Sequence, residues 1–163
     1  ATHAAISGED DDMNTNPWFC DHAVHLCIVV RDMEKTLDNY CALFHLERPP
    51  VKWTGTPKDA HVEYRDEPSP AMAKQAFLQF GMLRLELIEP DRNPSTWREY
   101  LDRNGDCVHH VAFEVDDMQE SLACLAQSGI QLIQKGDYNG GRYAYVGSEQ
   151  KLAVMMELLQ NDR

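Results

Sequence analysis

The feature that most constrains the fold of this chain is an internal duplication. Two stretches that lie 85 positions apart agree in residue type and in spacing. The matched pairs are His25 with His110, Val30 with Val115, Asp32 with Asp117, Met33 with Met118 and Leu37 with Leu122. Because a repeated sequence pattern encodes a repeated structural unit, the chain is expected to contain two similar modules in tandem.

Each copy predicts a strand that leads into a helix. Every second residue is apolar at the start of both copies, at Leu26, Ile28 and Val30 and at Val111, Phe113 and Val115. This period is typical of a strand with one packed face, and it leaves both histidines on the other face. An aspartate then stands at a helix N-cap position, and apolar side chains continue at helical spacing. We therefore expect strands at 24–30 and 108–115, and helices at 33–44 and 118–128.

A second pair of similar segments ends the two copies. Alternate residues are apolar in both segments, at Leu83, Leu85 and Leu87 and at Val154, Met156 and Leu158. These residues are predicted to face the helices, so that Glu86 and Glu157 point to the opposite face of the sheet. Each copy is thus predicted to be β-α-β-β-β, with two histidines and two glutamates on the face away from the helices.

The other expected elements follow from shorter signals. They are one or two strands within 51–65, a hairpin of 75–80 and 83–89 that turns at Gly81, a short helix at 94–101 that ends at Asn104-Gly105, and strands at 130–133, 143–146 and 152–159. The larger loop of the first copy spans about 54–72. The predicted organisation is a flexible acidic extension at 1–20, a first module at 21–90, a linker with a short helix at 91–107 and a second module at 108–163.

Composition limits the classes of partner. The formal net charge of −12 makes nucleic acid or an anionic membrane surface an unsuitable partner, because both need a basic footprint. Five cysteines without a C-x-x-C pair favour reduced thiols, and Cys27 is interpreted as a small buried hydrophobic residue. No apolar run is long enough to cross a bilayer, and no signal-peptide pattern opens the sequence. We expect a soluble cytoplasmic protein.

The two histidines and two glutamates together predict a metal centre. Imidazole nitrogens and carboxylate oxygens suit a divalent ion such as Zn, Ni, Co, Mn or Fe, and two carboxylates balance its charge. A single histidine beside an apolar strand is more often a core or surface residue, and a single glutamate is more often solvated. Four such residues at repeat-related positions with the same facing favour the metal. The predicted ligands are His25, Glu86, His110 and Glu157.

These four residues in paired β-α-β-β-β modules resemble the vicinal oxygen chelate superfamily, also called the glyoxalase fold, over nearly all of residues 22–160. The resemblance implies an α+β fold in which two modules form a cupped mixed sheet around one divalent metal ion, here Co, Ni, Zn or Mn. It also implies that the first and last strand of each module supply one ligand each. A small substrate then chelates the ion through neighbouring oxygens.

Within the superfamily, the resemblance is nearest to methylmalonyl-CoA epimerase. The segments that carry it are Glu86-Leu-Ile-Glu-Pro90, the stretch 94–101, Gly105, His109-His110-Val-Ala-Phe and Gly140-Gly141-Arg142. Glu86 stands where extradiol dioxygenases and fosfomycin-modifying enzymes are expected to have histidine, and Tyr145-Val-Gly-Ser148 departs from the turn expected in an epimerase. The implied activity is removal of a proton alpha to a carbonyl, with Glu157 and Glu86 as candidate catalytic residues. The alternatives are a glyoxalase I-type lyase and a non-catalytic module that binds a small ligand.

Further residues receive more limited roles. His109 is predicted to point to the opposite face in a structural role, and Arg84 to pair with Glu86 in preference to a substrate carboxylate. The second base that an epimerase needs is sought among the acidic residues of the long loop, Asp59, Glu63 and Glu67. The expected partners are a carbonyl or thioester substrate and a second copy of the chain in a homodimer.

Overall fold

The computed structural model describes residues 23–162, so the extension expected at 1–20 lies outside the described residues. The first half contains β1 (Ala23–Val29), α1 (Met33–Phe44), β2 (Lys52–Trp53), α2 (Pro57–Ala60), β3 (Glu63–Tyr64), β4 (Glu67–Pro68), β5 (Ala73–Phe80) and β6 (Leu83–Pro90). Helix α3 (Thr96–Asn104) follows. The second half contains β7 (Cys107–Glu114), α4 (Met118–Gln127), β8 (Leu132–Tyr138), β9 (Gly141–Val146), α5 (Glu149–Leu152) and β10 (Met155–Asn161).

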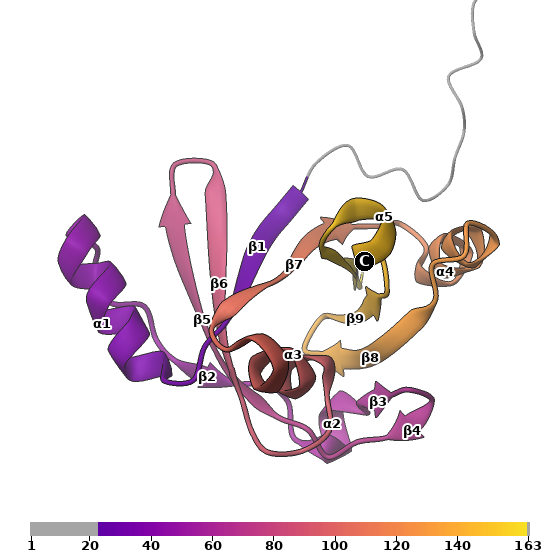
Figure 1. Cartoon of the computed structure of the whole chain (residues 1–163), viewed down its shortest axis with the longest axis horizontal. Helices are drawn as coiled ribbons and strands as arrows, with labels where there is room; N and C mark the ends of the chain where they lie inside the picture. Colours follow the sequence, from indigo (N-terminus) through magenta and orange to yellow (C-terminus); the bar gives the residue numbers. More distant parts are fainter. Residues whose placement is uncertain (1–22, 163) are drawn as a thin grey trace, which may run out of the picture.

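The strands form one curved mixed sheet whose centre is built from the repeat. The strand order is β2-β5-β6-β1-β7-β10-β9-β8-β3-β4 (Figure 1). Strand β1 pairs in parallel with β6, β7 pairs in parallel with β10, and β1 and β7 run antiparallel to each other. The predicted α+β fold of two β-α-β-β-β units in a cupped sheet is confirmed. Each histidine-bearing strand therefore lies beside the glutamate-bearing strand of its own half.

The two long helices begin where the sequence predicts. The carboxylate of Asp32 accepts a hydrogen bond from the backbone N–H of Lys35 at 3.0 Å, and that of Asp117 accepts one from Glu120 at 2.9 Å. Each cap satisfies a backbone donor that the first helical turn leaves free. Helices α1 and α4 consequently start at equivalent positions of the two halves, and they flank the sheet at opposite ends of the molecule (Figure 1).

Each half has its own apolar core between helix and sheet, on the face that the alternation predicts. Met33 and Leu37 of α1 pack with Leu85 and Leu87 of β6. The equivalent cluster of the second half contains Met118, Leu125, Met156 and Leu158. Leu83 departs from the expectation, because it lies at the end of the hairpin, beyond the cover of the helix, and is 48% exposed.

Three short segments differ from the sequence-based prediction. The long loop contains the single-turn helix α2 and the hairpin β3–β4, and β3 pairs with β8 of the other half, with Glu63 opposite Lys135. Strand β8 runs to Tyr138 through polar residues, and residues 149–152 form α5 ahead of a last strand that begins at Met155. Elements of two to four residues are too short to show a period, and a pairing between distant segments leaves no local signal.

Candidate metal centre

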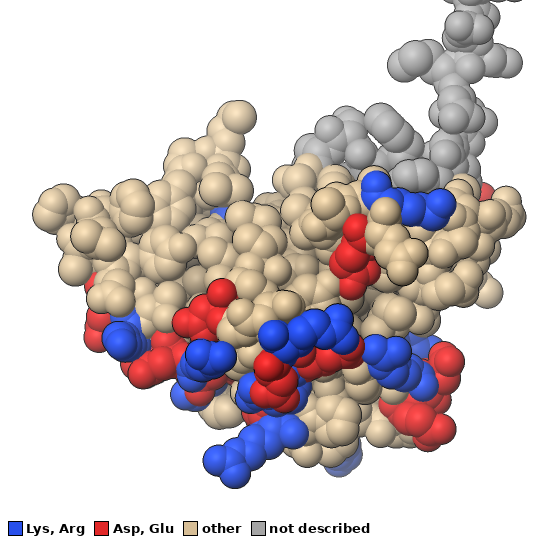
Figure 2. Space-filling view, in the orientation of Figure 1, with Lys and Arg blue, Asp and Glu red and all other residues tan. Residues whose placement is uncertain are grey.

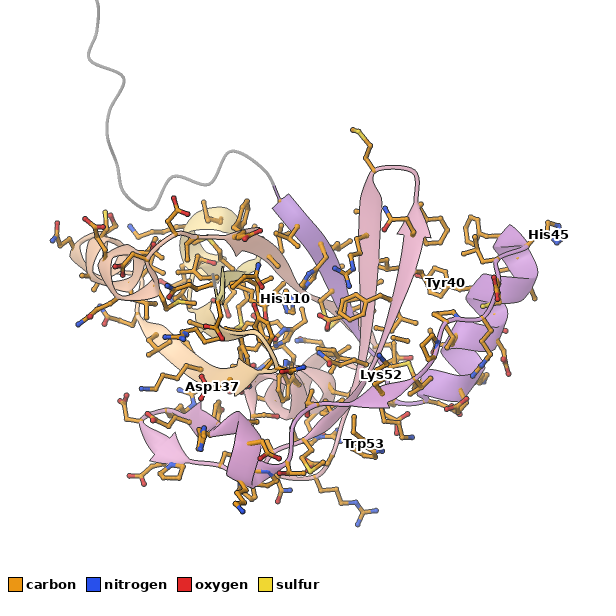
Figure 3. All side chains as sticks on the ribbon, turned by 180° about the vertical axis from the view of Figure 1, so that it is seen from behind. Tyr40, His45, Lys52, Trp53, His110 and Asp137 are labelled. Carbon is orange, nitrogen blue, oxygen red and sulfur yellow. The ribbon has the colours of Figure 1, made fainter. Side chains whose placement is uncertain are left out.

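The structure brings the four predicted ligands together from the four central strands. His25 lies on β1, Glu86 on β6, His110 on β7 and Glu157 on β10, and all four side chains are buried. Cys27 of β1 lies opposite Glu86 of β6 on one side and opposite His110 of β7 on the other, and this register places the ligand positions of the three strands at the same level of the sheet. Figure 3 shows His110 inside the fold, away from the outer surface.

The polar atoms of these residues converge on one point. The Nε2 atoms of His25 and His110 lie 3.0 Å apart. Oε2 of Glu157 lies 3.1 Å from Nε2 of His25 and 3.0 Å from Nε2 of His110, and the corresponding distances from Oε2 of Glu86 are 3.2 and 3.5 Å. The donor atoms of His25, Glu86 and His110 all lie within 4.8 Å of one another, and Glu157 lies beside both imidazoles, which is a spacing suited to ligands around a small ion.

Hydrogen bonding explains only part of this convergence, through the contact between the two Nε2 atoms. Oε2 of Glu157 is buried and has no partner in hydrogen-bond geometry among the described residues, although two ring nitrogens lie within ion-pair distance of it. A buried carboxylate oxygen without a hydrogen bond is costly unless a positive charge faces it. Two carboxylates and two imidazoles also balance the charge of one divalent cation. The residues present therefore fit such an ion.

The pKa values of the site residues also favour a positive charge between the two carboxylates. Burial alone would lower the pKa of His25, but Glu157 and Glu86 outweigh burial and raise it from 6.5 to about 9. Burial would raise the pKa of both carboxyl groups, yet the neighbouring His110 and His25 hold these pKa values below the usual range. Without a metal ion, a proton on the histidines takes the place of the cation.

Cys27, His109 and His110 form a second group whose donor atoms lie within 4.8 Å of one another. It fits a metal less well. Burial, together with the charges of Glu86 and Glu157, raises the pKa of the Cys27 thiol well above its usual value, and a metal binds the thiolate form. Cys27 is fully buried among core residues, as expected for a small hydrophobic side chain.

The prediction that His109 points away from the site is wrong. Strand β7 has a bulge: Cys27 pairs with His110 and Ile28 with Val108, so that His109 has no pairing position of its own. The bulge breaks the alternation of faces, and Nδ1 of His109 lies 2.8 Å from Nδ1 of His110. If His110 is to offer an unprotonated Nε2, its proton must sit on Nδ1, where His109 can accept it.

The predicted pairing of Arg84 with Glu86 is also wrong. The side-chain amide of Gln75 donates to Oε1 of Glu86 at 2.9 Å. The guanidinium of Arg84 instead lies over the ring of Phe77, 4.0 Å from its centroid. Phe77 stands directly opposite Glu86 on the neighbouring strand, and its ring occupies the surface between the two charged groups.

A cavity of about 380 Å³ opens onto three of the four residues, His25, Glu86 and Glu157, while His110 is buried behind its wall. Its wall carries aromatic residues that the sequence reading did not assign, Trp97, Tyr143 and Tyr145, and the indole N–H of Trp97 donates to the hydroxyl of Tyr145 at 3.0 Å. The period-2 spacing of the two tyrosines beside a ligand strand was the available signal. Trp53 and Asp137 also line the cavity.

The three acidic residues proposed as a second base do not line this cavity. Glu63 lies 3.0 Å from the ammonium of Lys135, Asp59 accepts from the hydroxyl of Thr56 at 2.5 Å, and Glu67 is exposed on β4. The further carboxylate in the described lining is that of Asp137, which lies 2.9 Å from Nδ1 of His61.

Comparison with known proteins identifies the family. The family model described as Glyoxalase/Bleomycin resistance protein/Dioxygenase superfamily matches residues 24–146. The chain belongs to this superfamily. A relative, the uncharacterised protein YqjC of Bacillus subtilis (strain 168), is 33% identical over 88 residues. That match covers 52% of this chain and 63% of YqjC, so it spans less than two thirds of the relative.

Solved structures of other proteins share the superfamily fold. A methylmalonyl-CoA epimerase variant of Streptomyces coelicolor, in complex with 2-nitronate-propionyl-CoA, is 20% identical with a TM-score of 0.63 and covers 89% of this chain and 100% of its own. The methylmalonyl-CoA epimerase of Mycobacterium tuberculosis is 16% identical with a TM-score of 0.61, and the match covers 93% of both chains. A hypothetical protein from Bacillus halodurans is 19% identical with a TM-score of 0.60, covering 87% of this chain and 95% of that one.

Proposed function

We propose that this superfamily member is a metal-dependent isomerase that removes the proton alpha to a carbonyl, with an epimerase of the methylmalonyl-CoA type as the first candidate. The observation that carries the proposal is the convergence of His25, Glu86, His110 and Glu157, three of which line one cavity while His110 lies buried beside them. The likeness to methylmalonyl-CoA epimerases supports the same choice. The four residues would hold one divalent ion, which supplies a Lewis acid for a substrate carbonyl.

The surroundings of the two glutamates favour Glu157 as the base. Gln75 holds Oε1 of Glu86 with a hydrogen bond, whereas Oε2 of Glu157 has no hydrogen-bond partner among the described residues. A carboxylate that leaves its cationic neighbours within a water-poor cavity regains a higher pKa, which suits proton abstraction near neutral pH. Glu157 is thus free to take the proton while Glu86 keeps its position.

An epimerase also needs a proton donor on the other side of the alpha carbon. Asp137 is the remaining carboxylic acid in the described lining of the cavity, and His61 lies beside it. The aromatic wall of Trp97, Tyr143 and Tyr145 limits the entry of water and so protects the deprotonated substrate. We assign the second proton transfer to Asp137.

Exchange of the alpha proton of methylmalonyl-CoA in heavy water tests the proposal. The metal-loaded protein should catalyse exchange, and Glu157→Gln should lower its rate by about 10²–10⁴-fold while metal is retained, because this is the usual contribution of a general base. Glu63→Gln, outside the cavity, is the matched control and should keep the wild-type rate. Methylglyoxal with a thiol tests the lyase alternative. If the loaded protein turns over neither substrate, the isomerase proposal is wrong.

A further inference from the structure

Arg84 has surroundings unlike those of most arginines in this chain. Among the described residues, no carboxylate lies within ion-pair distance of it, although the protein is strongly acidic. The arginines that do pair with carboxylates are Arg48, Arg65, Arg98, Arg103 and Arg142. Arg84 lines the cavity, and it is the one lysine or arginine in the described lining. Its cation is therefore available to something that enters the cavity.

The contacts of Arg84 orient its guanidinium group. The central carbon of the group lies 4.0 Å from the centroid of the Phe77 ring, and that ring meets the imidazole of His25 edge to face with centroids 5.9 Å apart. This contact uses the cation and the ring, and no described residue accepts a hydrogen bond from the N–H donors of the Arg84 guanidinium. One aromatic ring thus separates a hydrogen-bonding cation from the candidate metal centre.

The carboxylates that line the cavity restrict where an anionic ligand can bind. Glu86, Asp137 and Glu157 line the same space, so an anion that enters is repelled except where a cation faces it. Arg84 stands two residues before Glu86 on β6, and the two side chains share one face of the strand. A ligand held at the centre would reach Arg84 with a group only a few bonds away.

We infer that Arg84 binds a carboxylate on the acyl portion of the substrate, and that this site selects acyl groups with an anionic end. The inference rests on the proposed function only in taking the cavity as the substrate site. The guanidinium matches a carboxylate through two parallel N–H donors. A phosphate of coenzyme A would be the other source of an oxyanion, but the pantetheine arm separates it from the thioester by far more than one aromatic ring.

Binding to the cobalt-loaded protein tests the inference without turnover. We would measure 2-oxoglutarate, which has a chelating 2-oxo acid head and a distal carboxylate, beside 2-oxohexanoate, which has the same head and an uncharged alkyl end. The fluorescence of Trp53 and Trp97, which line the cavity, or the visible cobalt spectrum reports binding. Arg84→Met should weaken 2-oxoglutarate binding by about 10- to 100-fold, the value of a charge-assisted pair, and change the affinity for 2-oxohexanoate by less than about twofold. Arg84→Lys should fall between wild type and Arg84→Met.

Arg142→Met is the matched control, since Arg142 pairs with Asp162 outside the cavity lining, and it should leave both affinities unchanged. Equal weakening of both probes by Arg84→Met, no weakening of either, or no binding of 2-oxoglutarate to the wild type would each overturn the inference. If Arg84→Met weakened the binding of coenzyme A alone, Arg84 would be assigned to a phosphate, and the inference of a carboxylate site would also be overturned. A protein that binds 2-oxoglutarate through Arg84 but exchanges no alpha proton would remove the proposed function and leave this inference intact.

Discussion

The two halves of the molecule present the same pair of ligands in different surroundings. In the first half, the side-chain amide of Gln75 donates a hydrogen bond to the carboxylate of Glu86, while the ring of His25 contacts an apolar ring, that of Phe77. In the second half the support is reversed: His109 holds the ring of His110, while Glu157 has no hydrogen-bond partner at Oε2 among the described residues.

This difference shows how the two His–Glu pairs of a duplicated module can acquire separate roles. Duplication supplies two equivalent His and Glu positions, and later differences in the neighbouring residues fix one carboxylate and release the other. A held carboxylate serves as a permanent ligand, and a released carboxylate can accept a proton. The predictions below remove or isolate parts of this asymmetry, beginning with the largest expected effect.

Removal of a histidine from either half should abolish metal binding. His110→Ala and His25→Ala should each reduce the metal content of protein purified without chelator from about one ion per chain to near zero, because three ligands hold the ion far less well than four. Elemental analysis measures this, with His61→Ala as a control on an exposed histidine. Unchanged stoichiometry in Ala variants of all four positions would refute the ligand assignment.

Removal of the supporting residue should weaken metal binding in both halves without abolishing it. His109→Leu and Gln75→Leu should each lower metal affinity by about 10- to 100-fold, the usual cost of losing a group that orients a ligand. His109→Gln retains an acceptor for His110 and should recover most of the loss. Competition with a chromophoric chelator provides the affinities. If His109→Leu destabilises the fold but leaves the affinity unchanged, His109 has only a packing role.

The metal-free protein should have a pH optimum of stability that comes from the site. The pKa of His25 is raised from 6.5 to about 9, so its contribution is complete below about pH 6.5 and is lost as the pH rises through about 9. Glu86 has a lowered pKa, so its contribution is present above about pH 4.5 and is lost at lower pH.

Thermal unfolding of chelator-treated protein measures this dependence. The melting temperature should fall between about pH 6.5 and pH 9, and the slope should be smaller in His25→Gln, which lacks the titrating group of the first half. An equal slope in wild type and His25→Gln would show that other groups control the alkaline loss of stability.

Association of two chains should depend on the first half. Large exposed apolar side chains gather there, at Leu43, Phe44, Trp53, Met82 and Leu83, against Val108 and Leu152 in the second half. In Figure 2 the charged side chains lie mostly along the lower part of the visible face, which leaves its upper part, around the β5–β6 hairpin, largely uncharged. Both edge strands of the sheet, β2 and β4, have only two residues, so edge pairing is a poor alternative.

Sedimentation tests this association. Wild type should sediment as a dimer at micromolar concentration, and the double variant Leu43→Lys with Met82→Lys should shift it toward a monomer of 18.6 kDa. Val108→Lys is the control in the second half. A wild-type monomer would remove the homodimer prediction, and a dimer that the double variant leaves intact would place the interface elsewhere.

The sequence predicted those parts of the molecule whose signals repeat. The caps Asp32 and Asp117, the helices behind them and the facing of the two histidines and two glutamates all follow from local periods that occur twice. The same reasoning failed at His109, because a bulge adds one residue to the strand and reverses the expected face. It also failed at Arg84, where the cross-strand neighbours Gln75 and Phe77 decide which group pairs with Glu86.

None of the helices in the described part of the chain is long and apolar enough to cross a membrane. The expectation of a cytoplasmic location remains a prediction.

The pairing of β3 with β8 has a consequence for how the molecule can come apart. A segment of the first half completes the sheet of the second, so the halves are interlocked as well as adjacent. Residues 63–68 form β3 and β4, and β3 pairs with β8, so β8 has a neighbour on its outer side only while the first half is present. The dependence runs in one direction: the second half needs β3 and β4 of the first half to cover the edge of β8, so a cut between the halves would leave that edge exposed.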